Sequence, residues 1–407
     1  MQGISDKTFR YLCILEQDNF LLEYNDSIDN DIKYGISLIG FNIDNLRDNQ
    51  DSITLFSLDI CHKDFNAVRS KKNKKYIPFF KDRFFRDNMF AIFTVELDTS
   101  GNSYQYLAYG NRPISRIKIK SISFQSYEAP LFNNAKTALN IVNKIPRQQS
   151  NEISHKYHGN FSLKVYTVGQ GMCSLLCNGE IGYLLDAGAG TPVLRRNYKN
   201  GLKKNDLSKD VANLKKVYLI LSHLDSDHFR IIRWDSKILS KITTIFIPSN
   251  LTWIDSNEKS ILGKVKGIKK LSVTSPNLTL NTFRTEHHLN STEKNDNELV
   301  TYLMLENKSI LYPGDYTYDK IAKDSNNNIQ SLQKLNYDLL IVPHHGDKES
   351  QYKIPNPKDD SSRAYFSAGN HASWCHPTPE SLKEHALLGY KNLVKNKNSN
   401  IATIVTI

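Results

Sequence analysis

One short segment limits what this chain can fold into more than any other part of its sequence. Residues 219–228 read LILSHLDSDH, an apolar run that leads directly into His223, Asp225, Asp227 and His228. In an extended or looped segment alternate side chains project the same way, so the first three can converge while His228 reaches the same place around the turn. The segment therefore predicts a strand that ends in four potential metal ligands.

Three other apolar runs end in the same kinds of side chain. Asp186 follows one run, Asp315 follows a second, and the pair His344 and His345 follows a third. An unpaired buried carboxylate costs free energy, so strand ends of this kind require cations. Imidazole and carboxylate donors without thiolates fit a catalytic pair of Zn²⁺ or Mn²⁺ ions better than a structural cysteine-rich zinc site.

The length of 407 residues predicts two domains. Residues 1–150 contain alternating apolar runs, which indicate a strand-rich domain of unknown type that we expect to bind a substrate or a partner. Residues 146–158 are polar and show no periodicity, which is typical of a linker. Over residues 159–407 strands alternate with helices, so we predict a layered α/β domain with ligands at its strand ends.

The same patterns predict individual elements. In the first domain strands are expected over residues 34–41, 52–60, 89–97 and 114–124, with a helix over 133–144. In the second domain strands are expected over residues 161–168, 173–176, 182–185, 216–222, 244–248, 299–305, 309–312, 339–342 and 364–367. Helices are expected there over residues 211–215 with the turn before them, 229–239, 318–332 and 378–390.

The chain is basic, with 53 Lys and Arg against 42 Asp and Glu and a formal net charge of +11. Residues 1–60 have 4 basic and 11 acidic side chains, whereas residues 61–160 have 17 basic and 7 acidic ones. In residues 63–86 cations alternate with aromatic rings, which suits nucleic acid because cations neutralise phosphates and rings stack on bases. A solvated basic loop is the alternative. The candidate nucleic-acid-binding side chains are Lys71, Lys72, Lys74 and Lys75.

Targeting signals and disulfides are not expected. No run approaches the ~18 consecutive apolar residues of a membrane span. The first residues have no basic start that leads into an apolar stretch, as a signal peptide would. Five cysteines are an odd and small number for this length, which argues against a disulfide scaffold. These features predict a cytoplasmic protein without a membrane partner.

The ligand segment resembles a known signature. His223-x-Asp225-x-Asp227-His228 is similar to the His-x-His-x-Asp-His signature of the metallo-β-lactamase superfamily, with Asp225 in place of the second histidine. Four other segments occur in the family's order, and with them the chain looks most like the hydrolase domain of ComEC-type DNA-uptake (competence) proteins. They are Tyr166-Thr-Val-Gly169-Gln170-Gly171, Leu184-Leu-Asp186-Ala-Gly188, Pro343-His344-His345-Gly346, and Ser367-Ala-Gly369-Asn370 followed by His376-Pro377. The resemblance covers residues 161–407 and implies an αββα sandwich.

The resemblance also implies two divalent metal ions, Zn²⁺ or Mn²⁺, and a division of the ligands between them. One ion would lie at His223 and Asp225, and the other at Asp227, His228 and His345, with Asp315 bridging the two.

Further residues are expected around these ions. Asp186 would accept a hydrogen bond from a ligand histidine, as such imidazoles normally need. The resemblance favours His345 as the ligand and His344 as a residue that lines the site, although the choice between them stays open. Asn297 lies close to where the family carries a non-histidine equivalent of another ligand, so we place it in the pocket. The His-His pair at 287–288 is then interpreted as surface.

Two such ions would lower the pKa of a bridging water and hold the oxygens of a phosphodiester. Asp227 could accept a proton from that water, and His376 could donate one to the leaving oxygen or bind a phosphate, with a loop histidine as the alternative. The leading hypothesis is a soluble metal-dependent phosphodiesterase or nuclease acting on DNA or RNA, in DNA processing or in defence against foreign DNA. Two alternatives stay open: a hydrolase of a small ester, lactone or cyclic nucleotide, and a non-catalytic protein that binds nucleic acid or a partner.

Overall fold

The computed structural model divides the chain into two compact units. The first comprises Met1–Pro146 with Trp253–Gly263, and the second comprises Arg147–Thr252 with Lys264–Ile407. The structure describes residues 8–22, 24, 29–44, 55–70, 90–108, 114–125, 150–249, 261, 263–286, 296–369, 375–394 and 399–407. The lysines at 71, 72, 74 and 75, the helix expected over 133–144 and the His-His pair at 287–288 lie outside these residues. Among the helices of the described ranges, none has the length and apolar character needed to span a membrane.

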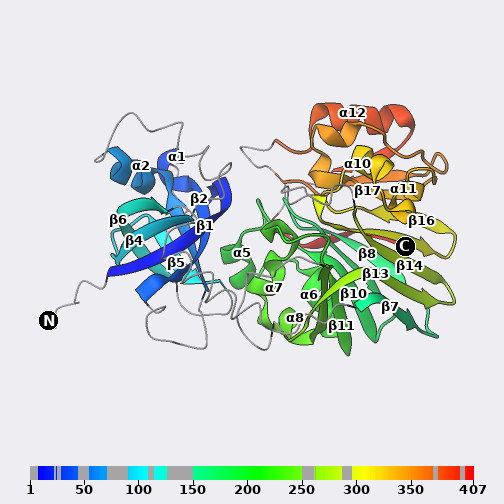
Figure 1. Cartoon of the computed structure of the whole chain (residues 1–407), viewed down its shortest axis with the longest axis horizontal. Helices are drawn as coiled ribbons and strands as arrows, with labels where there is room; N and C mark the ends of the chain where they lie inside the picture. Colours follow the sequence, from blue (N-terminus) through cyan, green and yellow to red (C-terminus); the bar gives the residue numbers. More distant parts are fainter. Residues whose placement is uncertain are drawn as a thin grey trace. The chain divides into compact units, whose positions relative to one another are not determined.

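The first unit contains a closed barrel of six antiparallel strands in the order β1-β2-β3-β5-β6-β4 (Figure 1). Alternate side chains of these strands, such as those of Leu38, Leu58 and Phe93, fill its hydrophobic core. The unit is strand-rich as predicted, although the sequence patterns do not predict β1 or β5. Its elements are β1 (Thr8–Leu21), α1 (Asn30–Lys33), β2 (Tyr34–Asn42), β3 (Leu55–Cys61), α2 (His62–Ser70), β4 (Phe90–Leu97), β5 (Ser103–Leu107) and β6 (Ser115–Gln125).

The second unit is built on one mixed sheet of fourteen strands. Its order is β19-β18-β17-β16-β15-β14-β13-β12-β11-β10-β9-β8-β20, and β7 pairs with β13. The strands are β7 (Ser150–Lys156), β8 (Ser162–Thr167), β9 (Cys173–Cys177), β10 (Ile181–Ala187), β11 (Lys216–Ile220), β12 (Ile242–Pro248), β13 (Val265–Ser275), β14 (Leu278–Arg284), β15 (Leu299–Leu305), β16 (Lys308–Tyr312), β17 (Leu339–Ile341), β18 (Arg363–Phe366), β19 (Lys391–Val394) and β20 (Ala402–Thr406).

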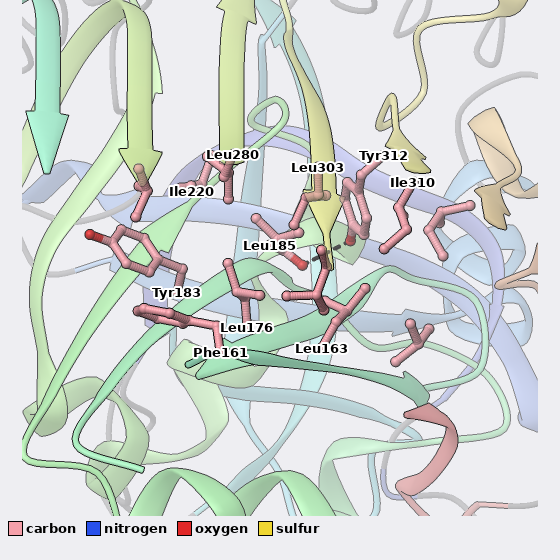
Figure 2. Close-up of a cluster of buried hydrophobic side chains, with 14 of the residues drawn as sticks. Phe161, Leu163, Leu176, Tyr183, Leu185, Ile220, Leu280, Leu303, Ile310 and Tyr312 are labelled. Atoms are coloured by element: carbon pink, nitrogen blue, oxygen red, sulfur yellow. Dashed lines mark hydrogen bonds between the residues drawn. The ribbon is translucent and has the colours of Figure 1, made fainter. Parts of the chain in front are cut away.

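This sheet folds back on itself, so that strands distant in its order share one hydrophobic core. Figure 2 shows Tyr312 of β16 donating a hydrogen bond to the carbonyl oxygen of Leu185 on β10, at 2.8 Å. Tyr365 of β18 donates to the carbonyl oxygen of Tyr166 on β8 at 3.0 Å. The two halves of the sheet therefore face each other across buried side chains. The resemblance implies an αββα sandwich with two layers of strands, and here the facing layers belong to one hydrogen-bonded sheet.

Helices accompany both halves of the sheet. Leu340 and Phe366 lie on the opposite face of β17 and β18 from that core, and they pack against Ile321 of α10 and Leu332 of α11. On the other half, α6, α7 and α8 contact β20, β10 and β12. Figure 1 shows these two helix groups apart within the unit. The helices are α5 (Arg195–Lys199), α6 (Asp206–Ala212), α7 (Arg230–Trp234), α8 (Ser236–Lys241), α10 (Tyr318–Lys323), α11 (Asn327–Leu332) and α12 (Pro379–Leu388).

The linker predicted over residues 146–158 is wrong for Ser150–Lys156, which forms β7 parallel to β13. The polar composition suggests a linker, but the polar side chain of His155 is hydrogen-bonded within the sheet. Its Nδ1 atom lies 2.5 Å from the hydroxyl of Tyr183, and its ring lies 5.0 Å from that of Tyr218. A hydrogen-bonded histidine thus occupies a strand position that an apolar side chain would ordinarily fill.

Three predicted helices also differ from the structure, in each case because a polar side chain begins a new helix. Asp235 accepts hydrogen bonds from the amides of Lys237 and Ile238, so residues 229–239 form α7 and α8 separately. Asn326 caps α11 in the same way and separates it from α10. Asn205 caps α6 through the amide of Ser208, so this helix begins at Asp206 and ends at Ala212, within the predicted 211–215.

Candidate metal centre

The predicted ligands gather where the two facing halves of the sheet meet. On one half, Asp186 is the next-to-last residue of β10, and the short 3₁₀ helix η2 (Ser226–His228) lies shortly after β11. On the other half, Asp315 follows β16 and His345 follows β17. The parallel pairs β10–β11 and β16–β17 bring these strand ends to common edges of the sheet.

Three imidazoles point at one carboxylate. The Nε2 atom of His223 lies 3.6 Å from Oδ2 of Asp315. On the other oxygen, Oδ1, the Nε2 atoms of His228 and His345 lie at 3.2 and 3.7 Å. His345 Nε2 is also 3.2 Å from Oδ2 of Asp227. Two donor sets result, His223 with His228 and Asp315, and Asp227 with His228 and His345, each with its ligand atoms within 4.8 Å of one another.

Each of these rings is held through its other nitrogen. His228 Nδ1 lies 2.8 Å from Asp186 Oδ2, and His345 Nδ1 donates to the carbonyl oxygen of Ser367 at 2.7 Å. His223 Nδ1 lies 3.2 Å from the hydroxyl of Ser222. The Nε2 atoms of all three rings are buried and have no hydrogen-bond partner. Oriented imidazoles with buried, unsatisfied Nε2 atoms are what a metal ion requires, so the residues present fit such an ion.

The buried charges shift one another's pKa values. Burial alone would lower the pKa of His228, but Asp315 and Asp186 outweigh it and raise that pKa well above its ordinary value. Burial would raise the pKa of Asp315, but the neighbouring histidines, His228 first, lower it well below its usual range. Burial lowers the pKa of His223, and the charge of His228 lowers it further. Because a metal ion competes with protons for these atoms, its affinity should fall as the pH falls.

Glycines let the ligand loop approach the ends of β8 and β10. A Cβ atom on Gly188 would lie 1.6 Å from the carbonyl oxygen of Asp227, and one on Gly171 would lie 2.6 Å from it. Arg230 ties the same loop down by donating to the carbonyl oxygen of Ala189 at 3.1 Å and to the hydroxyl of Ser226 at 2.8 Å. The small residues of both glycine-containing motifs therefore serve close backbone packing.

The two adjacent histidines have different surroundings. His345 is buried within the donor set, whereas the side chain of His344 is 35% exposed at its rim. Nδ1 of His344 lies 2.8 Å from Oδ2 of Asp347, and its Nε2 lies 3.8 Å from Asp315. Burial would lower the pKa of His344, but Asp315 and Asp347 raise it to about 9. The ring of His376 lies 5.7 Å from that of His344, and burial with the nearby histidines lowers its pKa to about 4.

Two predicted residues lie farther from the donor sets. Asp225 is one-third exposed, with Oδ2 3.8 Å from Nε2 of His223. Asn297 accepts a hydrogen bond from Arg284 at 2.9 Å, and it is the next residue, Glu298, that lies beside His223. Sequence reasoning missed Glu298, because this residue lies directly before an apolar run, whereas Asp186 and Asp315 are identified by their place at or after the end of one. It also missed the roles of Ser222 and Ser367, whose contacts with Asp186 and His345 join different strands, and that of Asp347, which contacts His344 three residues before it.

Comparisons with known proteins give only distant similarity. No family model and no curated protein matches the chain. Similar solved structures include YhfI from Bacillus subtilis, which is described as a metallo-beta-lactamase fold protein. Its sequence is 14% identical, the match covers 61% of this chain and 99% of that chain, and the TM-score is 0.34. Igni18, a metallo hydrolase from the archaeon Ignicoccus hospitalis, is 12% identical, with 60% and 98% covered and a TM-score of 0.37. A variant of the CmlA beta-hydroxylase is 11% identical, with 78% and 70% covered and a TM-score of 0.34. Similarity at this level establishes neither the fold nor the activity of this chain.

Proposed function

We propose that the second unit is a metal-dependent hydrolase with a metallo-β-lactamase-type αββα fold. The observation that carries this proposal is the set of three buried Nε2 atoms, of His223, His228 and His345, which lack hydrogen-bond partners and surround Asp315. Asp315 Oδ1 is likewise buried without a hydrogen-bond partner. The folded-back sheet with helices along both halves supports the fold assignment.

The arrangement around Asp315 supports two ions. Its Oδ2 faces His223, while its Oδ1 faces His228 and His345. His223 and Asp225 would hold one ion, Asp227, His228 and His345 the other, and Asp315 would bind both. Divalent Zn²⁺ or Mn²⁺ would acidify and orient a water and neutralise charge on the substrate.

Two side chains of the protein are placed to accept and to donate the protons of the reaction. Burial would raise the pKa of Asp227, but His345, 3.2 Å away, and the charge of His228 outweigh it and lower that pKa, so the ionised carboxylate can take up the proton of the attacking water. His344 is placed to donate a proton to the leaving oxygen. It is partly exposed, Asp347 orients its ring, and Ser350 fixes Asp347 with a hydrogen bond of 2.6 Å. We assign this role to His344 in place of His376, which lines the same rim.

We further propose that the substrate is a phosphodiester of DNA or RNA. Residues 195–216, which carry α5 and α6, have eight Lys and Arg and only two Asp. This segment is attached to the helix after the ligand loop, because the ring of Tyr198 of α5 packs against that of Trp234 of α7, with 5.9 Å between the ring centroids, and its hydroxyl donates to Asp235 at 2.6 Å. Arg195 is buried, whereas Lys203, Lys204 and Lys209 are exposed, and exposed cations on this segment favour a polyanionic substrate over a neutral ester. A ComEC-like role and the lysines at 71–75 stay part of this proposal.

A substrate panel tests the proposal. The protein would be incubated with single- and double-stranded DNA, RNA, cyclic nucleotides and a neutral lactone, each with Mn²⁺ or Zn²⁺. We expect cleavage of a nucleic acid, and hydrolysis of the lactone alone would contradict the phosphodiester assignment. Changing the exposed residues Lys203, Lys204 and Lys209 to Gln should raise KM and lower the salt dependence of binding by a slope of about 2–3, with kcat unchanged.

A matched variant controls for the loss of net charge. Lys334, Lys383 and Lys391 are also exposed but belong to the region of α11, α12 and β19. Changing these three to Gln removes the same formal charge and should leave KM and its salt dependence as they are in the unmodified protein. An equal effect of the two triple variants would mean that binding responds to net charge alone and would remove the support for residues 195–216.

A further inference from the structure

Glu298 is a fully buried carboxyl group directly before β15, and it contacts two of the candidate ligands. Its Oε2 atom accepts a hydrogen bond of 2.9 Å from the backbone amide of Asp315. The same oxygen lies 3.6 Å from Nδ1 of His223. Glu298 therefore lies behind the donor set, on the side of His223 that faces away from the Asp315 carboxylate.

Close packing at Gly314 and backbone hydrogen bonds hold the Glu298 carboxyl in place. A Cβ atom on Gly314 would lie 2.5 Å from Oε2 of Glu298, and Gly314 has a φ of +67°, which favours glycine. The backbone amide of Glu298 donates to the hydroxyl of Thr285 at 2.9 Å, and the next amide, of Leu299, donates to the carbonyl oxygen of Ser222 at 2.7 Å. Two contacts to neighbouring segments thus fix the residue that carries the carboxyl.

Burial of the Glu298 carboxyl costs folding free energy, which indicates that the carboxyl has a role in the protein. The other oxygen of Glu298, Oε1, is buried without a hydrogen-bond partner. Burying a carboxyl with one oxygen unsatisfied costs free energy, and an apolar side chain at this position would avoid that cost. Asp186 is a comparable buried carboxylate with a clear role: its Oδ2 lies 2.8 Å from Nδ1 of His228 and orients that ring.

We propose that Glu298 is a positioning residue for the ion on the His223 side of the centre. It acts by accepting the hydrogen bond of the Asp315 amide and by its position 3.6 Å from Nδ1 of His223. The inference rests on the proposed function, since it concerns the same metal centre. Of the three ligand histidines only His223 lies beside Glu298, whereas His228 and His345 are held by Asp186 and Ser367, so we expect the ion at His223 to depend on Glu298 most.

Two substitutions separate this role from mere burial. Glu298→Leu keeps a similar side-chain bulk but removes the hydrogen-bond acceptor. Glu298→Gln keeps an oxygen that can accept from the Asp315 amide. Equilibrium dialysis against Mn²⁺, followed by elemental analysis, gives the number and the affinity of bound ions. We expect the Leu variant to bind one of two ions with about 10–100-fold lower affinity and the Gln variant to bind both as the unmodified protein does.

Asp324→Asn is the matched control. Asp324 is equally buried and accepts a hydrogen bond of 2.6 Å from Tyr316, but it is not among the residues of either donor set. Its variant should keep both ions. Should the Leu variant fail to fold by circular dichroism, Glu298→Met, an unbranched side chain without a carboxyl, takes its place in the same comparison.

The outcomes are distinct. Equal binding of both ions by the Leu and unmodified proteins would overturn the role of Glu298, and so would a Gln variant that binds as poorly as the Leu variant. If the unmodified protein itself binds no ion, the proposed function fails, whatever the variants do.

Discussion

The two units each bury a carboxylate, and they treat it in opposite ways. In the barrel, Asp59 is fully buried and accepts hydrogen bonds from Tyr106 at 2.8 Å and Ser37 at 3.2 Å. In the second unit, Asp315 is nearly as buried, but its Oδ1 has no hydrogen-bond partner and faces imidazole nitrogens. Neutral hydroxyl donors satisfy the first carboxylate, whereas the second is surrounded by further ligand atoms. This difference separates a structural polar cluster from one that is built for a cation.

Histidines of the second unit show the same contrast. Both ring nitrogens of buried His385 are engaged, Nδ1 with the carbonyl oxygen of Ser381 at 2.7 Å and Nε2 with the hydroxyl of Tyr318 at 3.2 Å. His345 uses only Nδ1 and leaves Nε2 toward Asp315 and Asp227. Burial alone therefore does not identify a ligand; the unsatisfied nitrogen does.

The largest effect is expected from Asp227→Ala. This change removes both a ligand and the proton acceptor, so hydrolysis should fall by more than the ~100-fold that loss of a supporting partner can cause. Activity assays and elemental analysis of the same preparation measure the result, with binding of nucleic acid largely retained. Cleavage that survives the change would point to a contaminating enzyme and would remove Asp227 from the mechanism.

A smaller effect is expected from Asp186→Asn. Asp186 accepts hydrogen bonds from the amide and hydroxyl of Ser222 at 2.8 and 2.9 Å, and it holds His228. Loss of its charge should lower metal affinity by about 10–100-fold without abolishing binding. Asp59→Asn in the barrel is the control, and metal titration should show no change for it. Equal losses in the two variants would erase the distinction between the clusters.

The smallest effect concerns stability alone and is expected from His385→Gln. Burial lowers the pKa of His385 to about 4 from its ordinary 6.5, so as the pH falls the unfolded chain takes up a proton first and the folded state loses stability between these values. The Gln variant should lack this loss, on the order of 3 kcal/mol across the window. Urea unfolding at pH 7 and pH 4.5 without added metal measures it. A change in metal content would show that His385 is not merely structural.

The sequence predicts those parts of the centre that lie at the ends of apolar runs. Asp186, Asp315 and the segment 219–228 each follow a strand, and the parallel pairing of these strands brings them together. Glu298 and Ser367 could not be chosen in this way, because their roles depend on which strand ends face each other across the folded sheet. The same holds for β7, whose polar His155 is satisfied by Tyr183 on a distant strand.

Local patterns also fail where secondary structure depends on neighbours. β13 and β14 form a long hairpin, but polar and apolar residues mix along β13 because it pairs with three strands. The short edge strand β19 has few buried side chains to create a pattern. Capping residues such as Asp235 and Asn326 are visible in the sequence, and they mark the positions at which the predicted helices break.

The most direct test of the account is the metal content of the unmodified protein. The purified chain would be stripped with a chelator, dialysed against Mn²⁺ or Zn²⁺, and analysed for bound metal together with its melting temperature. We predict up to two ions per chain and a higher Tm with metal, by several degrees at a free concentration of about 100 Kd. A protein that binds neither ion and melts at the same temperature with and without it would contradict the proposed metal centre.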